Sequence, residues 1–356
     1  MSGRTRVGVV FGGRSPEHAV SVVSARSILR EADPQRFEAV PFGISRGGSW
    51  LTPAETRRRL ERVAVGETDT LGDDSDGQLL RAHEVLDALA DLDVVFPIVH
   101  GRLGEDGTLQ GLCELADKPC VGSGVAASAV GMDKALMRAA FAAAGLPQPR
   151  YAVLRDDDAV QPPPDLLRAI EGEIGYPCFV KPANGGSSLG VSKARTREDL
   201  IEGAATAARY DRKILIEEAI GGREVECAVI GNAHPSASPL GEIRPKAEFY
   251  TYEAKYSDDT TELIVPAALA DDTAMRVQEA ALAAYAAVDC AGMARVDFFV
   301  TPDDDIRIIE VNTLPGFTPI SMYPRLWQHA GMSYAALISR LVDLAVERHE
   351  ETRRYA

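Results

Sequence analysis

The stretch that most constrains the fold of this 356-residue chain is Gly292–Tyr323. Residues Ala294–Val300 and Ile306–Val311 are rich in β-branched and aromatic side chains, and a Pro/Asp turn cluster separates them. This pattern predicts a β-hairpin. Alternate residues of a strand share one face. We therefore expect each strand to present one polar face: Arg295, Asp297 and Phe299 on the first, and Ile306, Ile308, Glu310 and Asn312 on the second.

The polar residues of this hairpin predict a metal site. If Asp297 lies opposite Glu310, then Arg295 lies opposite Asn312. Burying charge is costly unless the charge is paired or bound to an ion. Carboxylate and amide oxygens suit Mg²⁺, which keeps other coordination positions for phosphates. The sequence therefore favours a magnesium site at Asp297, Glu310 and Asn312, with a solvated hairpin face and an incidental salt bridge as the alternative.

Two stretches near the N-terminus are typical of α/β folds. Strand Arg6–Phe11 runs into a Gly-Gly turn and a helix start, with Ser15 expected as the N-cap. Strand Asp93–His100 is nearly continuously apolar and leads into a glycine-containing loop. Open α/β sheets bind ligands at the carboxyl ends of their strands. Glu17 is therefore either a ligand group or a partner of the helix dipole.

A second glycine-rich loop predicts phosphate binding. Strand Cys178–Lys181 leads into a loop that contains Ser187 and Ser188. Consecutive backbone N–H groups and two hydroxyls suit phosphate oxygens, and the amine of Lys181 can reach a nucleotide phosphate. A plain glycine hairpin is the alternative. The GxxxxGK[ST] pattern of P-loop NTPases is absent, and so is a dinucleotide-binding GxGxxG with a downstream acidic residue.

Two further segments suggest ligand contacts. Strand Lys213–Ile220 carries Glu217 and Glu218, whose carboxylates can accept hydrogen bonds from an adenine amine and a ribose, or can simply be solvated. Residues Glu248–Thr261 are polar and aromatic-rich, a composition that suits a lid loop. The charged, turn-rich stretch Arg57–Gly77 is expected to be a solvated helix and loop without a site.

Composition limits the classes of partner. The net charge of −15 argues against nucleic acid, since a phosphate backbone requires a basic patch. Five scattered cysteines without a CxxC pair argue against a disulfide framework. The N-terminus runs straight into a strand, and no apolar run approaches the ~18 residues that a membrane helix needs. We expect a cytoplasmic protein without a membrane partner.

Taken together, these segments resemble the D-alanine–D-alanine ligase family of the ATP-grasp superfamily. The similarity covers nearly the whole chain and lies in GGRSPEHAVS (12–21), VHGRLGEDGTLQG (99–111), MDK (132–134), KPANGGSSLGV (181–191), EAKYSDDT (253–260), RVDFF (295–299) and EVNTLPGFTPISMYP (310–324). It implies an α/β fold of three domains: a Rossmann-like, doubly wound domain at residues 1–130, a small ATP-grasp domain at 131–220, and a C-terminal ATP-grasp domain at 221–356 with the metal site and lid.

The resemblance also implies the reaction, ATP-dependent joining of two D-alanine molecules through a D-alanyl phosphate for peptidoglycan synthesis. It implies two Mg²⁺ ions, replaceable by Mn²⁺, and a homodimer formed through the N-terminal domain. The implied nucleotide contacts are Lys134, Lys181, Ser187, Ser188, Glu217, Glu218, Ala219, Ile220, Glu224, Lys255 and Phe299. The implied D-alanine contacts are Glu17, Val20, His100, Tyr256, Arg295, Gly316, Ser321 and Met322, among which Glu17, Ser187, Tyr256, Arg295, Gly316 and Ser321 are expected to be catalytic.

Two alternatives remain at this level. A ligase that joins D-alanine to D-lactate is the nearest, but ligases of that kind lack the lid-loop tyrosine that this chain has at Tyr256. A non-catalytic nucleotide-binding protein would lack metal ligands or a phosphate-binding lysine, and all of these are present here. Ala19 departs from the pattern, because many relatives have a second acidic residue there. We expect the departure to be neutral because Glu17 is retained.

Overall fold

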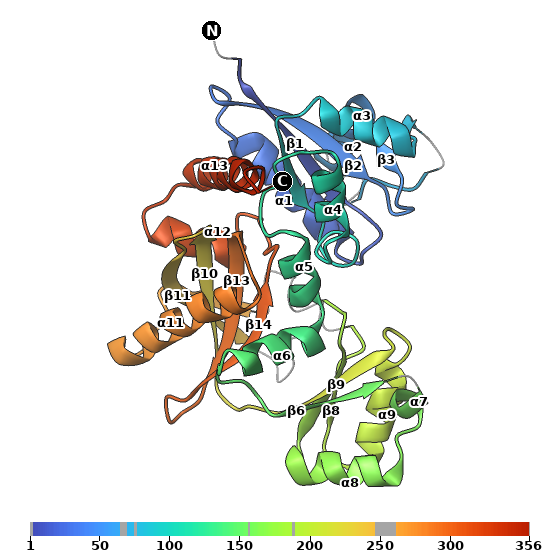
Figure 1. Ribbon diagram of the computed structural model, residues 1–356, viewed down its shortest axis with the longest axis vertical. Coiled ribbons are helices and arrows are strands. Elements are labelled where there is room, and N and C mark those ends of the chain that lie inside the picture. The colour runs from blue at the N-terminus through green and yellow to red at the C-terminus, as the bar shows by residue number, and fades with distance from the viewer. Residues whose placement is uncertain are drawn as a thin grey trace.

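A computed structural model describes residues 3–64, 70–74, 77–155, 157–186, 189–245 and 261–355. The described strands form three sheets, and each sheet draws its strands from one of the three ranges predicted as domains. In Figure 1 the N-terminal sheet lies at the top, the four-stranded sheet at the bottom, and the C-terminal sheet to one side. Helices α5 (Val125–Met132) and α6 (Lys134–Ala143) connect the upper part to the lower.

The N-terminal sheet has a parallel centre, as its apolar strands predict. Its order is β4-β3-β2-β1-β5, in which β1 pairs in parallel with both β2 and β5. The strands are β1 (Thr5–Gly12), β2 (Phe37–Ile44), β3 (Trp50–Leu51), β4 (Leu79–Leu80) and β5 (Val94–Ile98). Helices α1 (His18–Glu31), α2 (Pro53–Ala64), α3 (Ala82–Ala90) and α4 (Thr108–Leu115) belong to this part of the chain.

The four-stranded sheet is antiparallel, in the order β6-β9-β7-β8. Its strands are β6 (Tyr151–Arg155), β7 (Cys178–Pro182), β8 (Ser192–Ala194) and β9 (Lys213–Glu218). Helices α7 (Asp157–Val160), α8 (Pro164–Glu173) and α9 (Arg197–Ala207) accompany it. Its apolar cluster, which includes Leu154, Val180, Leu200 and Ile216, comes entirely from residues 154–216. This sheet therefore has a hydrophobic core of its own.

The C-terminal sheet contains the predicted hairpin. Its order is β12-β11-β10-β13-β14, with strands β10 (Arg223–Gly231), β11 (Ser236–Pro245), β12 (Thr261–Ile264), β13 (Gly292–Val300) and β14 (Ile306–Asn312). The predicted register is confirmed, because Asp297 pairs with Glu310 and Arg295 with Asn312.

One part of the hairpin prediction is wrong. The register shifts after Asp297, where Phe298 pairs with Ile308 and leaves Ile309 as an extra residue. This β-bulge reverses the alternation of faces. Ile306 and Ile308 consequently lie in the hydrophobic core, and Ile309 faces the polar side together with Glu310.

The remaining helices are α11 (Asp271–Ala287), α12 (Met322–His329) and α13 (Tyr334–Thr352). Helix α12 was not predicted from the sequence, and α13 begins three residues after Gly331, which lies in a turn with a positive φ of 92°. Helix α1 begins at His18, later than the predicted cap at Ser15, although the Ser15 hydroxyl accepts a hydrogen bond from the Glu17 N–H at 3.1 Å. No helix in the described ranges is long and apolar enough to cross a membrane.

The stretch expected to be solvated around α2 contains a buried ion pair. Arg59 is 6% exposed and Glu55 7% exposed, and their Nε–Oε1 distance is 2.7 Å. Arg59 also donates through Nη1 to the backbone oxygens of Leu71 and Asp73. Arg59 of α2 is therefore held in a tertiary contact and is not solvated, because a buried guanidinium requires acceptors on several sides. All five cysteines are free and buried, as expected for a chain without a disulfide framework.

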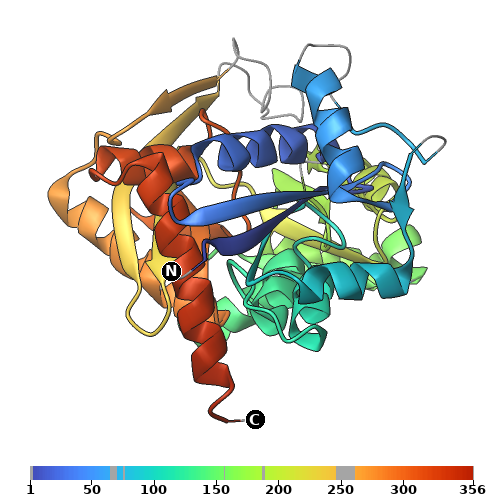
Figure 2. The ribbon, with the colours of Figure 1, turned by 90° about the horizontal axis from the view of Figure 1, so that it is seen from above.

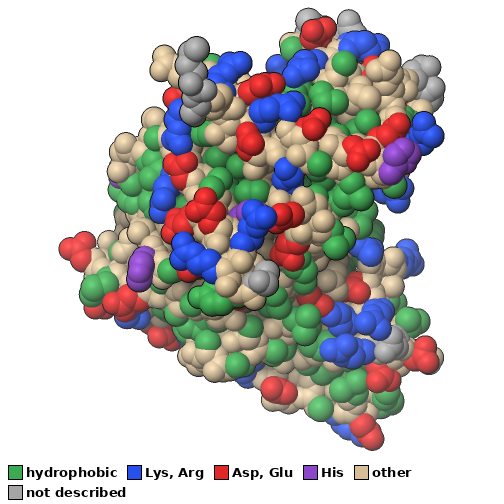
Figure 3. Space-filling view, turned by 45° about the horizontal axis from the view of Figure 1, so that its top comes forward, with side chains coloured by type: hydrophobic (Ala, Val, Ile, Leu, Met, Phe, Trp, Pro, Cys, Tyr) green, Lys and Arg blue, Asp and Glu red, His purple; other side chains and the backbone are tan. Residues whose placement is uncertain are grey.

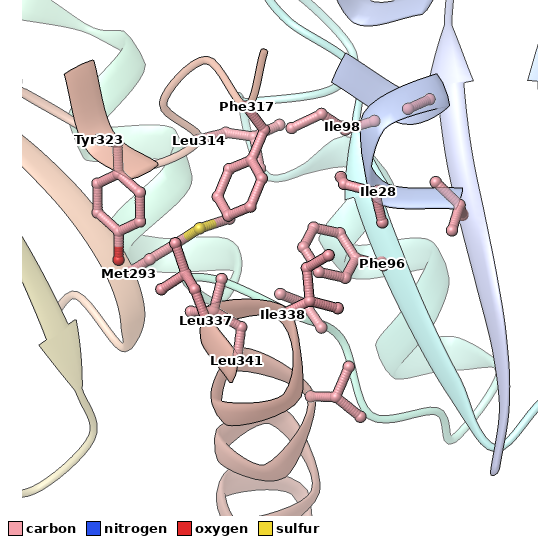
Figure 4. Close-up of a cluster of buried hydrophobic side chains, with 14 of the residues drawn as sticks. Ile28, Phe96, Ile98, Met293, Leu314, Phe317, Tyr323, Leu337, Ile338 and Leu341 are labelled. Atoms are coloured by element: carbon pink, nitrogen blue, oxygen red, sulfur yellow. The ribbon is translucent and has the colours of Figure 1, made fainter. Parts of the chain in front are cut away.

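The N-terminal sheet and the C-terminal helices share one hydrophobic core. Figure 2 shows α13 running beside the N-terminal strands. Phe317 lies at the centre of this core and is fully buried (Figure 4). Its ring centroid is 5.9 Å from that of Phe96 in β5 and 5.5 Å from that of Tyr334 in α13, both in edge-to-face geometry. Aromatic pairs of this kind add to the gain from burial.

We predict that Phe317→Ala lowers the free energy of unfolding by about 3–5 kcal/mol, because it leaves a cavity between two parts of the chain. Urea denaturation followed by circular dichroism measures this loss. Leu115→Ala is the control, since that side chain is 86% exposed, and it should change stability by no more than ~0.5 kcal/mol. Equal effects of the two substitutions would contradict the role given to Phe317.

Candidate active site

A cleft of about 540 Å³ brings together residues of the C-terminal and four-stranded sheets with residues that follow strands of the N-terminal sheet. The predicted site residues that line it are Glu17, Val20, His100, Lys134, Lys181, Glu224, Arg295, Asp297, Phe299, Glu310, Asn312, Gly316, Ser321 and Met322. These residues are separated by up to about 300 positions in the chain, so the fold alone brings them together. Figure 3 shows acidic and basic side chains interspersed on one face of the molecule. That face has no large patch of a single charge, so a charged ligand there would be bound by individual side chains.

Some predicted residues lie elsewhere. Glu217 and Glu218 are at the end of β9 and, with Ala219 and Ile220, are not among the residues that line the cleft. Glu217 is 4% exposed and ion-paired, so it is not a solvated group. Glu218 pairs with Arg150 at 2.6 Å. Ser187, Ser188, Lys255, Tyr256 and all of the proposed lid Glu248–Thr261 except Thr261, where β12 begins, lie outside the described residues.

Glu17 lies where two glycine-containing loops meet. A Cβ atom on Gly186 of the phosphate loop would be 3.1 Å from Glu17 Oε2, and one on Gly101 would be 3.5 Å from the same oxygen. The contact at Gly186 is tighter than an ordinary Cβ contact, whereas at Gly101 a Cβ atom would meet Ser15 Oγ at 2.7 Å before it met Glu17. The end of β1, the loop after β5 and the loop after β7 thus converge on one carboxylate.

His100 is buried beside Glu17 and is held by Glu105. Its Nδ1 lies 3.4 Å from Glu105 Oε1, and Glu105 Oε2 accepts a hydrogen bond from the Gly101 N–H at 2.8 Å. Burial opposes the charged imidazolium, but the hydrogen bond and charge of Glu105 outweigh it and raise the pKa of His100. The raised pKa extends upward the pH range over which this ring is protonated beside Glu105.

Arg295 lies between two carboxylates. It donates to both oxygens of Asp297 at 2.7 Å, and its Nε is 3.1 Å from Glu226 Oε1. Burial disfavours the guanidinium charge, yet Asp297 and Glu226 raise its pKa well above the usual value. The sequence reading missed Glu226, although strand alternation puts it on the same face as Glu224. That spacing is the signal that should have identified it.

Two lysines from different elements line the cleft. Lys134 Nζ donates to the Gly185 carbonyl at 2.9 Å and lies 3.3 Å from Glu310 Oε2. Lys181 Nζ lies 2.9 Å from Glu217 Oε1. Burial lowers the pKa of Lys181, although the charge of Glu217 opposes that shift. Both ammonium groups are thus already paired with carboxylates beside the loop predicted to bind phosphate.

The loop before α12 is held by Ser321. The Thr318 N–H donates to Ser321 Oγ at 3.0 Å, and the two hydroxyls lie 2.8 Å apart. A Cβ atom on Gly316 would be 2.9 Å from Ser321 Oγ, so a larger residue there would push the serine away. Gly316 also precedes the buried Phe317. This fixes the glycine backbone at the cleft.

The donor set of the predicted metal site fits a magnesium ion. Among the described residues, no three His, Cys, Asp or Glu side chains form a group that could hold a metal ion. Mg²⁺, however, binds through one or two carboxylates together with substrate phosphates. Asp297, Glu310 and the amide of Asn312 provide such oxygens on neighbouring strands. Both oxygens of Asp297 accept from Arg295, so an ion would share them with the guanidinium.

Two family models match the chain. The model described as D-ala D-ala ligase N-terminus matches residues 6–123, and that described as D-ala D-ala ligase C-terminus matches residues 140–343. A D-alanine–D-alanine ligase of Geobacillus thermodenitrificans is 47% identical over 353 residues, which cover 98% of this chain and 97% of that protein. One of Bacillus velezensis is 47% identical over 348 residues, covering 96% and 98%.

Solved structures show the same fold. The D-alanine-D-alanine ligase from Coxiella burnetii superposes with a TM-score of 0.82 at 33% sequence identity, covering 99% of this chain and 97% of that chain. The VanG D-Ala:D-Ser ligase from Enterococcus faecalis superposes with a TM-score of 0.80 at 31% identity, covering 96% and 100%. The three-domain ATP-grasp fold expected from the sequence is therefore the fold of this chain.

We predict that Glu217→Gln lowers the free energy of unfolding by about 3 kcal/mol near pH 7, because it leaves two buried cations without their carboxylate. Burial alone would raise the pKa of Glu217, but Lys181 and Arg138 hold it below its usual value of 4.5. A depressed pKa contributes stability above the unfolded value, and this contribution is lost as pH falls through the folded value.

The stability difference between the wild type and Glu217→Gln should therefore be constant from about pH 6 to 8 and shrink below about pH 4.5. Urea denaturation at each pH measures it. Glu202→Gln, at an exposed position of α9, serves as the control. A difference that grew on acidification would contradict the charge assignment.

Proposed function

This chain belongs to the D-alanine–D-alanine ligase family, and we propose that it joins two D-alanine molecules at the expense of ATP. The observation that carries this proposal is the convergence of a carboxylate, two lysines, an arginine and the metal-type oxygens in one cleft. Ligation needs these groups together, since an ammonium, a triphosphate and an acyl group must meet there. ATP is the energy source that the family uses.

In the proposed reaction, the first D-alanine carboxylate attacks the γ-phosphorus of ATP and gives D-alanyl phosphate and ADP. The amine of the second D-alanine then attacks the acyl carbon, loses a proton and expels phosphate. Glu17 binds the ammonium of the first D-alanine, which keeps its carboxylate directed at the nucleotide. This role is supported by the position of Glu17 beside Gly101 and Gly186.

Negative charge that develops during both steps is stabilised by fixed donors. Lys134 and Lys181 bind the phosphates, and Arg295 with the Gly316 N–H stabilises oxyanion character at the acyl carbon. Such donors cost no reorganisation when they are held in advance, and Arg295 is held by two carboxylates. Val20, His100, Ser321 and Met322 border the D-alanine sites, with Ser321 on the carboxylate of the second D-alanine.

Asp297, Glu310 and Asn312 would hold the Mg²⁺ ions, and Mn²⁺ would substitute. The bound ions would neutralise phosphate charge. Phe299 and Glu224, which line the cleft, are proposed to contact the nucleotide. Ser187 and Ser188 are proposed to bind phosphate, with Ser187 and Tyr256 orienting Glu17. Lys255 and the segment 217–220, which is not among the residues that line the cleft, are proposed as further nucleotide contacts. We also propose a cytoplasmic homodimer formed through the N-terminal domain.

The most specific part of the proposal is the identity of the second substrate. One structural neighbour is named as a D-Ala:D-Ser ligase, so D-serine must be tested beside D-lactate. Tyr256 favours the dipeptide product over D-alanyl-D-lactate. We expect D-alanyl-D-alanine as the main product.

The test is phosphate release from ATP and Mg²⁺ with D-alanine alone, with L-alanine, or with D-alanine plus equimolar D-serine or D-lactate, with products identified by mass. We expect release only with D-alanine, and D-alanyl-D-alanine as the main product in every mixture at about pH 7. If D-alanyl-D-serine or D-alanyl-D-lactate were the main product, D-serine or D-lactate would be assigned as the second substrate. If D-alanine caused no phosphate release, the ligase proposal would be overturned.

We predict that Glu310→Gln lowers kcat at least about tenfold, because the amide loses the charge that holds the metal ion. Mn²⁺ affinity in the presence of ADP, followed by electron paramagnetic resonance, should fall as well. Glu347→Gln, at an exposed position of α13, is the matched control. An unchanged rate together with unchanged Mn²⁺ affinity would refute the metal role of Glu310.

A further inference from the structure

A buried arginine that does not line the cleft bridges two of the three sheets. Arg138 lies in α6, and its side chain is among the largest fully buried ones. Nη1 donates to the Ile308 carbonyl of β14 at 2.6 Å, and Nη2 forms an ion pair with Glu217 Oε2 of β9. One guanidinium thus contacts both the C-terminal and the four-stranded sheet. Neither the sequence motifs nor the proposed reaction gives this residue a role.

The contact with Ile308 holds the guanidinium in place at the β-bulge. The bulge puts Ile309 out of register, and the neighbouring Ile308 also donates its N–H to the Pro147 carbonyl at 2.8 Å. The segment that includes and follows α6 therefore satisfies both backbone groups of Ile308. This arrangement fixes Nη2 toward Glu217, because a planar guanidinium presents its donors in a rigid fork.

Glu217 has two cationic partners, whose side chains differ in how tightly they are held. The Lys181 side chain is 13% exposed and lines the cleft, whereas the Arg138 side chain is 1% exposed and fixed at both ends. Only Lys181 can turn toward a ligand. If it did so without another cation beside Glu217, it would leave a buried carboxylate uncompensated, at a cost of several kcal/mol. Repulsion from Arg138 also lowers the pKa of Lys181, after the larger effect of burial.

We propose that Arg138 is a positioning residue for nucleotide binding, which keeps Glu217 compensated so that Lys181 is free to bind phosphate. This proposal rests on the proposed function, specifically on Lys181 as a phosphate ligand. Without the arginine charge, Lys181 remains the sole partner of Glu217 and is held back from the nucleotide.

The test is the affinity for ADP with Mg²⁺, measured by calorimetry on full-length variants. Arg138→Met should weaken ADP binding about tenfold, equivalent to ~1.4 kcal/mol. Its fold should be retained without ligand, because Lys181 still pairs with Glu217. Arg138→Lys should bind ADP within about threefold of the wild type, because it keeps the positive charge. The KM for D-alanine should change less than about twofold in both variants, since the effect acts through Lys181.

A second neutral variant separates charge from packing. Arg138→Gln retains a donor for the Ile308 carbonyl and should lose ADP affinity to the same extent as Arg138→Met, so it carries the test if the methionine variant does not fold. Arg168→Met is the matched control, since it removes an exposed guanidinium of α8 that pairs with Asp165 and with no proposed nucleotide contact. It should leave ADP affinity within about twofold.

The outcomes distinguish this inference from the proposed function. Wild-type binding of ADP, lost in Lys181→Met, supports Lys181 as a phosphate ligand. If Arg138→Gln and Arg138→Met then bind ADP as the wild type does, the inference alone is overturned, and a lower melting temperature in them would assign Arg138 a structural role. If the wild type does not bind ADP, both proposals fail.

Discussion

The arrangement of the cleft depends on the compensation of buried charge. Arg295 is held between Asp297 and Glu226, and Lys134 lies against Glu310. A charge in a protein interior is tolerated only with a partner, so each charged group fixes the position of the next. Substrates that carry phosphate, ammonium and carboxylate groups would exchange partners with these residues. Binding is then a rearrangement among paired ions, with no isolated charge left behind.

Local patterns in the sequence predicted most of the elements that form the site. The alternation of polar and apolar residues in 294–300 and 306–311 was sufficient to predict the hairpin and the Asp297–Glu310 pairing. It failed at Ile309, because a β-bulge breaks the alternation there, beside the hydrogen bond from Arg138 to the Ile308 carbonyl. The glycine loops beside Glu17 and Lys181 were likewise visible as turn residues after apolar strands, which is a local signal.

Contacts between distant segments were not predictable in the same way. Glu217 was read as a solvated or ligand-binding group, but Arg138 lies 79 residues away in the chain and holds it in the interior. Arg59 was assigned to a solvated helix for the same reason, since its acceptors come from a later loop. Helix α12 also escaped notice, because its apolar residues are interrupted by Pro324 and Arg325. A single sequence does not show which charges will meet.

The division of the hydrophobic cores has a mechanical consequence. The N-terminal sheet shares one core with the C-terminal helices, and Met137 and Phe141 of α6 pack in the core of the C-terminal sheet. The buried apolar cluster of the four-stranded sheet lies within residues 154–216, and polar contacts connect this sheet to α6, among them the Arg138–Glu217 ion pair and the hydrogen bond from the Lys134 N–H to the Ala183 carbonyl. Ion pairs can exchange partners without exposing apolar surface, whereas separating a shared core cannot avoid it. Separating the N-terminal sheet from α13 would therefore expose the apolar side chains of a shared core, whereas separating the four-stranded sheet from α6 would first break ion pairs and backbone hydrogen bonds.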